Sequence, residues 1–588
     1  MPAYDRAVRY LRMLLNSALA GALAAVYLTV LFLQLNPDVP LLPATFGPLA
    51  AVVLLSYGLH FAVAFYVLSV LRQMFGEDML SPGWLSVRVL AWLGALAATA
   101  GAVLMWLNLR GLRSSLDAEA AQHMALGAAV LTLCAVAFLV LALVRRTLQP
   151  ARWPLGAVLL ALVLATSVAG PLALRGAGGP RKPPGPGPDR ASAFPPPAAD
   201  ARVTMMLVDG ASLDFVSPAA AAGRLPNFGR LFDAGSVMHL ATLRPTQPAP
   251  AWTAVATGKR PSRNGVRSAS TYHVGPAGPS LDLLPDYCLA HGLVYFGFLH
   301  ETPQTSASVR ARTLWDILTA SGIGSGVVRW PLTYPAQPMK GVLVSDQLHR
   351  TADPVLQGSE PPVTHPAGFA ASLETRLDSF PIGPVAMTGL PDDAPYPGAG
   401  SLAIDRFYAD VFENVRKVPD LQFTALRFQG LDTMGHYFLR QATPRDFGDV
   451  SEDERRQFGR VLEQYYRYID DELGRAIDRI GPNELLIVVS AFGMEPVSMP
   501  KRALERLLGN PELSGTHERA PDGFLMALGP AVRRGRLPRA SVVDVAPTVL
   551  YFFGLPIGRD MDGYARTDIF SQAFTEERPL TFIPSYER

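Results

Sequence analysis

The chain has 588 residues and a formal net charge of +2 at pH 7. A mean hydropathy of +0.20 is high for a soluble protein, and the length exceeds one ordinary core, so the sequence predicts a membrane part joined to a folded domain. The small net charge gives no reason to expect a nucleic-acid partner.

Five apolar stretches occupy the first third of the chain. Each reaches the roughly 20 residues that a helix needs to cross about 30 Å of hydrocarbon. The sequence therefore predicts a transmembrane domain of five helices over residues 1–174, with the lipid bilayer as its partner. The stretches are residues 17–35, 49–71, 85–107, 124–144 and 153–174.

The orientation of these helices follows from the positions of arginine in the short loops. Arginines precede the first stretch, follow the second and separate the fourth from the fifth, which places the N-terminus in the cytoplasm. An odd number of helices then puts the rest of the chain in the periplasm or outside the cell. Abundant Pro, Gly and Ala, with Arg favoured over Lys, suggest a bacterium, so we expect a multi-pass protein of the inner (cytoplasmic) membrane. The arginines are Arg6, Arg9, Arg12, Arg72, Arg145, Arg146 and Arg152.

Residues 175–201 are rich in Pro, Gly and Ala and include the run Pro195-Pro196-Pro197. This composition cannot bury a core and favours extended polyproline-type backbone. We therefore predict a semi-rigid linker between the helices and a C-terminal domain over residues 202–588.

Short β-branched runs alternate with helical patterns in the C-terminal domain. Residues 203–208, 326–328, 423–427 and 485–489 read as buried strands, and residues 311–320 and 456–480 as helices. This alternation predicts an α/β domain with a central, mostly parallel sheet. Functional sites in such domains lie at the C-terminal ends of the strands, and Asp209, Asp432 and Ala491 all follow or end predicted strands there.

An ordered set of motifs along this domain resembles the type I phosphodiesterase and nucleotide pyrophosphatase family of the alkaline phosphatase superfamily. Each motif is weak alone, but their order along almost the whole domain is specific. The motifs are Val208-Asp209-Gly210, residues 250–258 with Pro261 and Asn264-Gly265-Val266, Leu314-Trp315-Asp316, residues 330–335, 432–436, His517 with Pro521-Asp522-Gly523, and residues 544–550 with Gly554-Leu555-Pro556.

The resemblance implies a site for two zinc ions, one that activates a Ser or Thr nucleophile and one that stabilises the leaving oxygen. Asp432, His436 and His517 would hold the leaving-group ion. Asp209, the nucleophile and an Asp-His pair would hold the other.

The chain departs from the family pattern around that other ion. Ser490-Ala491-Phe492-Gly493 has the frame of a Ser-Asp-His-Gly motif, with Ala491 and Phe492 in place of the two ligands. Pro248 stands at the nucleophile position and has no oxygen with which to attack. Asn264 stands where the family pattern has a His. We therefore expect one zinc ion rather than two, and loss of two-metal covalent catalysis.

Several alternatives remain open at this point. Thr246 or Thr253 could replace the missing nucleophile, and Asp209 could cap the turn that follows it instead of binding metal. The remaining three ligands could also form a single-zinc site with an open position.

Two functions are consistent with these residues. The first is a pseudoenzyme or binding protein for a phosphate-ester or lipid-linked ligand in the bacterial envelope. The second is an active zinc-dependent hydrolase or transferase of phosphate esters, since five spans before such a domain resemble envelope phospho-group transferases. The sequence indicates no substrate, no oligomeric state, and no role for the helices beyond anchoring.

Overall fold

The computed structural model describes residues 2–75, 87–144, 153–176, 200–275, 278–350, 361–374, 400–508 and 513–587. The chain forms two compact units, one of residues 1–181 with 270–303, and one of residues 182–269 with 304–588. Residues 177–199 of the expected linker lie outside the described residues, so the semi-rigid linker stays a prediction.

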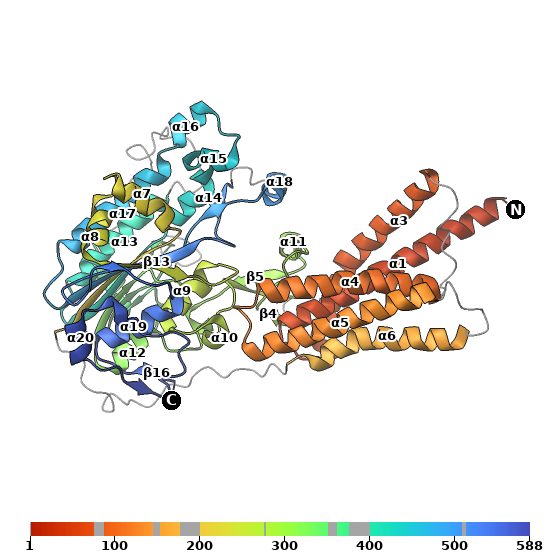
Figure 1. The fold of residues 1–588 in the computed structure, drawn as a ribbon, viewed down its shortest axis with the longest axis horizontal. Helices are drawn as coiled ribbons and strands as arrows, with labels where there is room; N and C mark the ends of the chain where they lie inside the picture. The colour runs from red at the N-terminus through yellow and green to blue at the C-terminus, as the bar shows by residue number, and fades with distance from the viewer. Residues whose placement is uncertain are drawn as a thin grey trace. The chain divides into compact units, whose positions relative to one another are not determined.

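The first unit contains the five apolar helical spans that the sequence predicts (Figure 1). They run over Val8–Leu35, Pro43–Arg72, Val89–Gly111, Ala118–Val144 and Leu155–Leu174. Their outer surfaces expose aliphatic side chains such as Leu133 and Val158, which suits a lipid environment. The elements are α1 (Pro2–Leu35), α2 (Pro43–Val53), the π-helix η1 (Leu54–Gly58), α3 (Leu59–Phe75), α4 (Val87–Gly111), α5 (Ala118–Val144) and α6 (Trp153–Leu174).

The first unit also includes residues 270–303, which we call the insert. The sequence placed this segment inside the C-terminal domain. The insert consists of a three-stranded antiparallel sheet in the order β4-β3-β5 and a short helix. Its leucines share one core with the helices, and this burial is why it groups with them. The elements are β3 (Ser270–His273), β4 (Ser280–Leu281), α11 (His291–Tyr295) and β5 (His300–Pro303).

The second unit is built on a ten-stranded sheet with the order β14-β2-β13-β10-β1-β9-β6-β7-β8, and β15 also pairs with β2. The five adjacent strands from β10 to β7 are parallel, as predicted. The strands are β1 (Arg202–Val208), β2 (Ser236–Ala241), β6 (Gly324–Val328), β7 (Gly341–Val344), β8 (Thr364–His365), β9 (Leu421–Phe428), β10 (Glu484–Phe492), β13 (Asp522–Leu528), β14 (Gly535–Arg536) and β15 (Ala540–Ser541).

Helices cover both faces of this sheet (Figure 1). Successive side chains of a strand point to opposite faces, so Met205 and Leu207 of β1 join one core while Met206 and Val208 join the other. The α/β prediction is thus confirmed. The first core includes residues of α9 (Pro248–Thr257), α12 (Leu314–Ala320) and α19 (Val545–Phe552), and the second includes α7 (Leu213–Ala221), α8 (Pro226–Ala234), α13 (Ser401–Arg416), α14 (Gly430–Ala442) and α17 (Val461–Ile477).

The four predicted strands lie within β1, β6, β9 and β10, but one predicted helix begins later than expected and the other is divided. Thr313 and Asp316 form a capping box, which starts α12 at Leu314. The pattern over residues 456–480 divides into the end of α16 (Glu452–Phe458) and α17. A Cβ on Gly459 would lie 2.4 Å from the Arg455 carbonyl oxygen, so glycine suits the break between them.

Candidate metal centre

Three residues from two separate parts of the second unit form a potential metal site. Asp432 and His436 lie on α14, which follows β9, and four-residue spacing puts them on the same side of the helix. His517 follows β12 (Gly515–Thr516), which pairs with β11 (Glu495–Pro496). One ligand atom from each of the three residues lies within 4.8 Å of the others. The structure therefore brings together the three ligands expected for the leaving-group ion.

Backbone carbonyls orient both imidazole rings of this triad. Nδ1 of His436 lies 2.8 Å from the Gly515 carbonyl oxygen, and Nδ1 of His517 lies 2.9 Å from the Thr246 carbonyl oxygen. A ring nitrogen that faces a carbonyl carries the proton and donates it, which leaves Nε2 free to bind a metal. In its neutral form, each histidine is therefore oriented to present Nε2 to a metal.

Asp432 contributes a carboxylate oxygen that has no partner among the described residues. The side chain is buried, and its Oδ1 makes no hydrogen bond. Burial disfavours ionisation, but His436, whose Nε2 lies 3.6 Å from Oδ2, and His517 hold the pKa of Asp432 below its ordinary value when their rings are protonated. A buried, ionised oxygen without a donor is costly unless a cation neutralises it. One carboxylate and two imidazoles form a donor set that suits Zn²⁺.

Two glycines allow the close backbone approaches around the triad. Gly210 has φ of 72°, and a Cβ there would lie 3.0 Å from Cα of Asp432. A Cβ on Gly515 would lie 2.3 Å from the carbonyl oxygen of Gly435. A larger residue at either position would push a loop away from α14.

Asp209, the fourth expected metal ligand, lies outside this triad and has other partners. Nη2 of Arg427 lies 2.5 Å from its Oδ2, and Nε of Arg427 lies 3.0 and 3.1 Å from its two oxygens. Trp252 Nε1 donates a further hydrogen bond, 2.8 Å long, to Oδ1. Burial raises the pKa of Asp209, and the charge of Arg427 opposes that shift. Both carboxylate oxygens are therefore bound by side chains.

Arg427 is the site residue that sequence reasoning missed. It lies in β9, where Leu207 of β1 is its direct neighbour, so it reaches Asp209 just beyond the end of β1. The available signal was a single arginine within an apolar strand, because such a charge needs a buried partner.

The position expected for the nucleophile is the first residue of a helix. Pro248 begins α9, where its missing N–H costs no helical hydrogen bond. The hydroxyl of Thr246 is buried and donates to the Leu243 carbonyl at 2.7 Å. The hydroxyl of Thr253 donates to the Ala249 carbonyl at 2.8 Å. Both candidate substitutes are thus held by backbone oxygens.

Ala491 and Phe492 end β10 and are completely buried. The Phe492 ring centroid lies 5.1 Å from that of His517. An apolar ring therefore adjoins the triad on the side of β10. Asn264 is also buried, and its side chain donates to the Lys259 carbonyl and accepts from the Val266 N–H.

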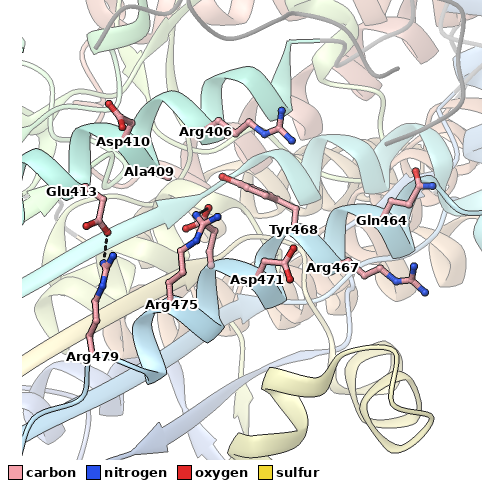
Figure 2. A pocket seen from close by; sticks show the side chains of 11 residues that line it. Arg406, Ala409, Asp410, Glu413, Gln464, Arg467, Tyr468, Asp471, Arg475 and Arg479 are labelled. Carbon is pink, nitrogen blue, oxygen red and sulfur yellow. Dashed lines mark hydrogen bonds and ion pairs between the residues drawn. The ribbon is translucent and has the colours of Figure 1, made fainter. Parts of the chain in front are cut away.

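A cavity of about 720 Å³ lies elsewhere in the second unit, between α13 and α17 (Figure 2). None of the residues discussed above lines it. Its charged groups largely pair with each other, as Arg479 does with Glu413 at 2.5 Å and Arg475 with Glu472 at 2.6 Å. The cavity thus carries both positive and negative side chains and does not indicate a particular ligand.

Comparisons with known proteins agree with the motif order. The profile of a family described as type I phosphodiesterase / nucleotide pyrophosphatase matches residues 203–549, which is more than half of the chain. A comparison with curated proteins gives no match. Among solved structures, the chain is similar to an inactive variant of murine ectonucleotide pyrophosphatase/phosphodiesterase 5 in complex with AMP, at 14% identity and a TM-score of 0.38, over 63% of this chain and 100% of that one.

Proposed function

The chain belongs to the type I phosphodiesterase and nucleotide pyrophosphatase family, and we propose that it is a membrane-anchored member that has lost two-metal catalysis and serves to bind a phosphate ester. In this proposal Asp432, His436 and His517 hold one zinc ion, and the second metal position of the family is absent. The ligand is a phosphate ester, free or linked to a lipid.

One observation carries the proposal, namely the ion pair between Arg427 and Asp209. Their side chains are 5% and 0% exposed, so the pair is removed from water. The guanidinium already neutralises Asp209, and a second cation beside it would meet like-charge repulsion at short range. Neither Ala491 nor Phe492 offers a donor atom that could compensate.

The retained triad supports metal binding by a different argument. Two oriented Nε2 atoms and an unpartnered carboxylate oxygen would occupy three positions of a tetrahedral zinc site. A zinc ion bound there would attract a phosphate oxygen or lower the pKa of a bound water. The chain's own residues hold the ligands in place through the Gly515 and Thr246 carbonyls.

Five apolar helices indicate a multi-pass membrane protein with a C-terminal domain. We assign the N-terminus to the cytoplasm and the C-terminal domain to the outer side of a bacterial inner membrane. The arginines of the short loops support this orientation. Within the first unit, the insert hydrogen-bonds Asn36, just after α1, and Asn108, near the end of α4. Arg175, at the end of α6, donates to the carbonyl of Asn36. The ends of the first, third and fifth spans thus lie together within the first unit.

Metal content of the full-length protein in lipid nanodiscs tests the proposal. We expect about one zinc ion per chain, which is the number that three protein ligands and one open position imply. His517→Ala should remove this ion, while the exposed control His239→Ala should retain it. Two tightly bound ions in the native protein, or an ion that survives His517→Ala, would contradict the one-site proposal.

The second candidate is a single-zinc hydrolase or a transferase of phosphate groups, and the open fourth position of the triad favours it. Turnover of a bis-aryl phosphate diester distinguishes the two candidates. A binding protein gives no turnover in either form. Turnover that disappears in His517→Ala and persists in His239→Ala would establish the enzyme instead.

A further inference from the structure

The insert carries a group of large apolar side chains that face outward. Tyr287, Leu289, Tyr295, Phe296 and Phe298 form this group, which we call the aromatic surface. Leu289 is 70% exposed and Phe296 is 72% exposed. The rings of Tyr295 and Phe296 meet edge to face, with centroids 5.1 Å apart. Contiguous exposed apolar groups of this kind mark an interaction site.

The insert is also fixed to the helices by hydrogen bonds. Asn36 accepts hydrogen bonds from the N–H groups of Asp282 and Leu283 and donates to the Leu283 carbonyl. Asn108 accepts from the Asp286 N–H and donates to its carbonyl. Both asparagines are buried. These bonds hold the insert at the ends of α1 and α4, where Figure 1 also places β4 and β5.

The aromatic surface continues the apolar outer surface of α4. Val103, Trp106 and Leu107 are exposed in the last turns of that helix. A Cβ on Gly111, the last residue of α4, would lie 3.9 Å from the Tyr287 hydroxyl oxygen. Trp and Tyr side chains favour the boundary between lipid head groups and acyl chains. A bilayer that surrounds α4 therefore reaches Tyr287 at its outer edge.

The charged residues of the insert indicate which interactions it can make with lipid head groups. Residues 270–303 contain no Lys or Arg, while Asp282, Asp286 and Glu301 are acidic. The insert itself therefore offers anionic head groups no Lys or Arg, so its own contact rests on apolar burial, whereas Arg110 and Arg113 at this end of α4 are exposed cations.

We propose that the aromatic surface enters the head-group and acyl-chain boundary of the leaflet at the ectodomain end of the helices. The insert is then an interfacial anchor of the helical unit. This proposal rests on the membrane-spanning helices and is independent of the metal site.

Photo-crosslinking to lipid tests the proposal without altering the protein. Full-length protein in phosphatidylcholine nanodiscs is irradiated with an analogue that carries a diazirine near the glycerol end of an acyl chain. Adducts are then located by peptide mass spectrometry. We expect adducts within residues 286–298 and on the Trp106 peptide of α4. The comparison residue is Tyr564 of the second unit, which is 79% exposed and reports the level of non-specific labelling.

Labelling of α4 without labelling of residues 286–298 would overturn the proposal, as would equal labelling of the insert and Tyr564. If the insert is unlabelled but its amides are protected from hydrogen exchange, the aromatic surface instead contacts a protein partner or a second copy of the chain.

The double substitution Tyr295→Ser with Phe296→Ser should lower the number of lipid adducts on the insert about fivefold or more, and leave those on α4 unchanged. Phe582→Ser should change neither. A strong rise in insert adducts on enrichment with anionic lipid would show electrostatic binding and contradict apolar insertion.

Discussion

Arg427 and Asp209 meet as a fully buried ion pair, in which Nη2 lies 2.5 Å from Oδ2 and Nε lies within 3.1 Å of both carboxylate oxygens. The pair connects the end of β1 to β9, two strands that are direct neighbours. Trp252 Nε1 completes the donors around the carboxylate. An arginine thus supplies, from within the chain, the positive charge beside Asp209.

Arg427→Met should destabilise the second unit strongly. Removal of one partner from a buried pair leaves an uncompensated charge, which typically costs about 3–5 kcal/mol. Chemical denaturation of the full-length protein, followed by a signal from the second unit, gives the change in the free energy of unfolding. The control Arg479→Met removes an exposed pair with Glu413 and should cost less than about 1 kcal/mol. A similarly small loss for Arg427→Met would show that the pair does not support the fold.

Pro248→Thr should not restore turnover of a bis-aryl phosphate diester. A hydroxyl at the start of α9 would still lack an activating ion, because Ala491 and Phe492 provide no ligands and Asp209 is bound to Arg427. Product release should equal that of the native protein under saturating zinc. The matched variant Pro248→Ala separates a hydroxyl effect from the removal of proline. Turnover in Pro248→Thr alone would indicate that the nucleophile was the only missing component.

Gly515→Ala should weaken zinc binding. The added Cβ would meet the Gly435 carbonyl oxygen at 2.3 Å, so β12 must move away from α14 and lengthen the contact between His436 and the Gly515 carbonyl. Loss of such an orienting contact typically lowers metal affinity about 10–100-fold. Competition with a chromophoric chelator measures the affinity. Gly229→Ala in α8 meets no atom within 4 Å and should leave the affinity unchanged. Equal affinities of both variants would refute the role of this contact.

Asn36→Leu should release the insert from the helices. Two N–H groups and one carbonyl, from Asp282 and Leu283, would lose their partners at a cost of about 1–3 kcal/mol each. Hydrogen exchange in nanodiscs should therefore become about tenfold faster, or more, at the amides of Asp282 and Leu283. Ser69→Ala serves as the control, because Ser69 donates to the Phe65 carbonyl of its own helix. Unchanged exchange would mean that the leucine contacts alone hold the insert.

The sequence predicted those parts of the molecule that local patterns encode. Residue spacing places Asp432 and His436 on one side of α14, and continuous apolar runs identify β1, β9 and β10. The pairing of Arg427 with Asp209 was not predictable in this way. The two residues are 218 positions apart, and their contact depends on the register between β1 and β9.

The insert escaped prediction for another physical reason. Its strands are two to four residues long, so the alternation of apolar and polar residues that marks a strand is too short to recognise. The residues that attach it, Asn36 and Asn108, are polar positions within or just beyond apolar spans. A buried asparagine at a helix end signals a backbone partner, although the sequence does not identify which segment supplies it.

Because the insert belongs to the helical unit, the polypeptide passes between the two units three times, near residues 181, 269 and 303. A cut in the first passage separates the backbone of the helices from the rest of the chain, and the phosphodiesterase-family domain then stays with the helices only through the noncovalent contacts of the insert. For the same reason, a truncated protein that begins at residue 202 carries Leu281, Leu283 and Leu293 without the helices that bury them. Such a fragment aggregates through the insert unless residues 270–303 are removed with the helices.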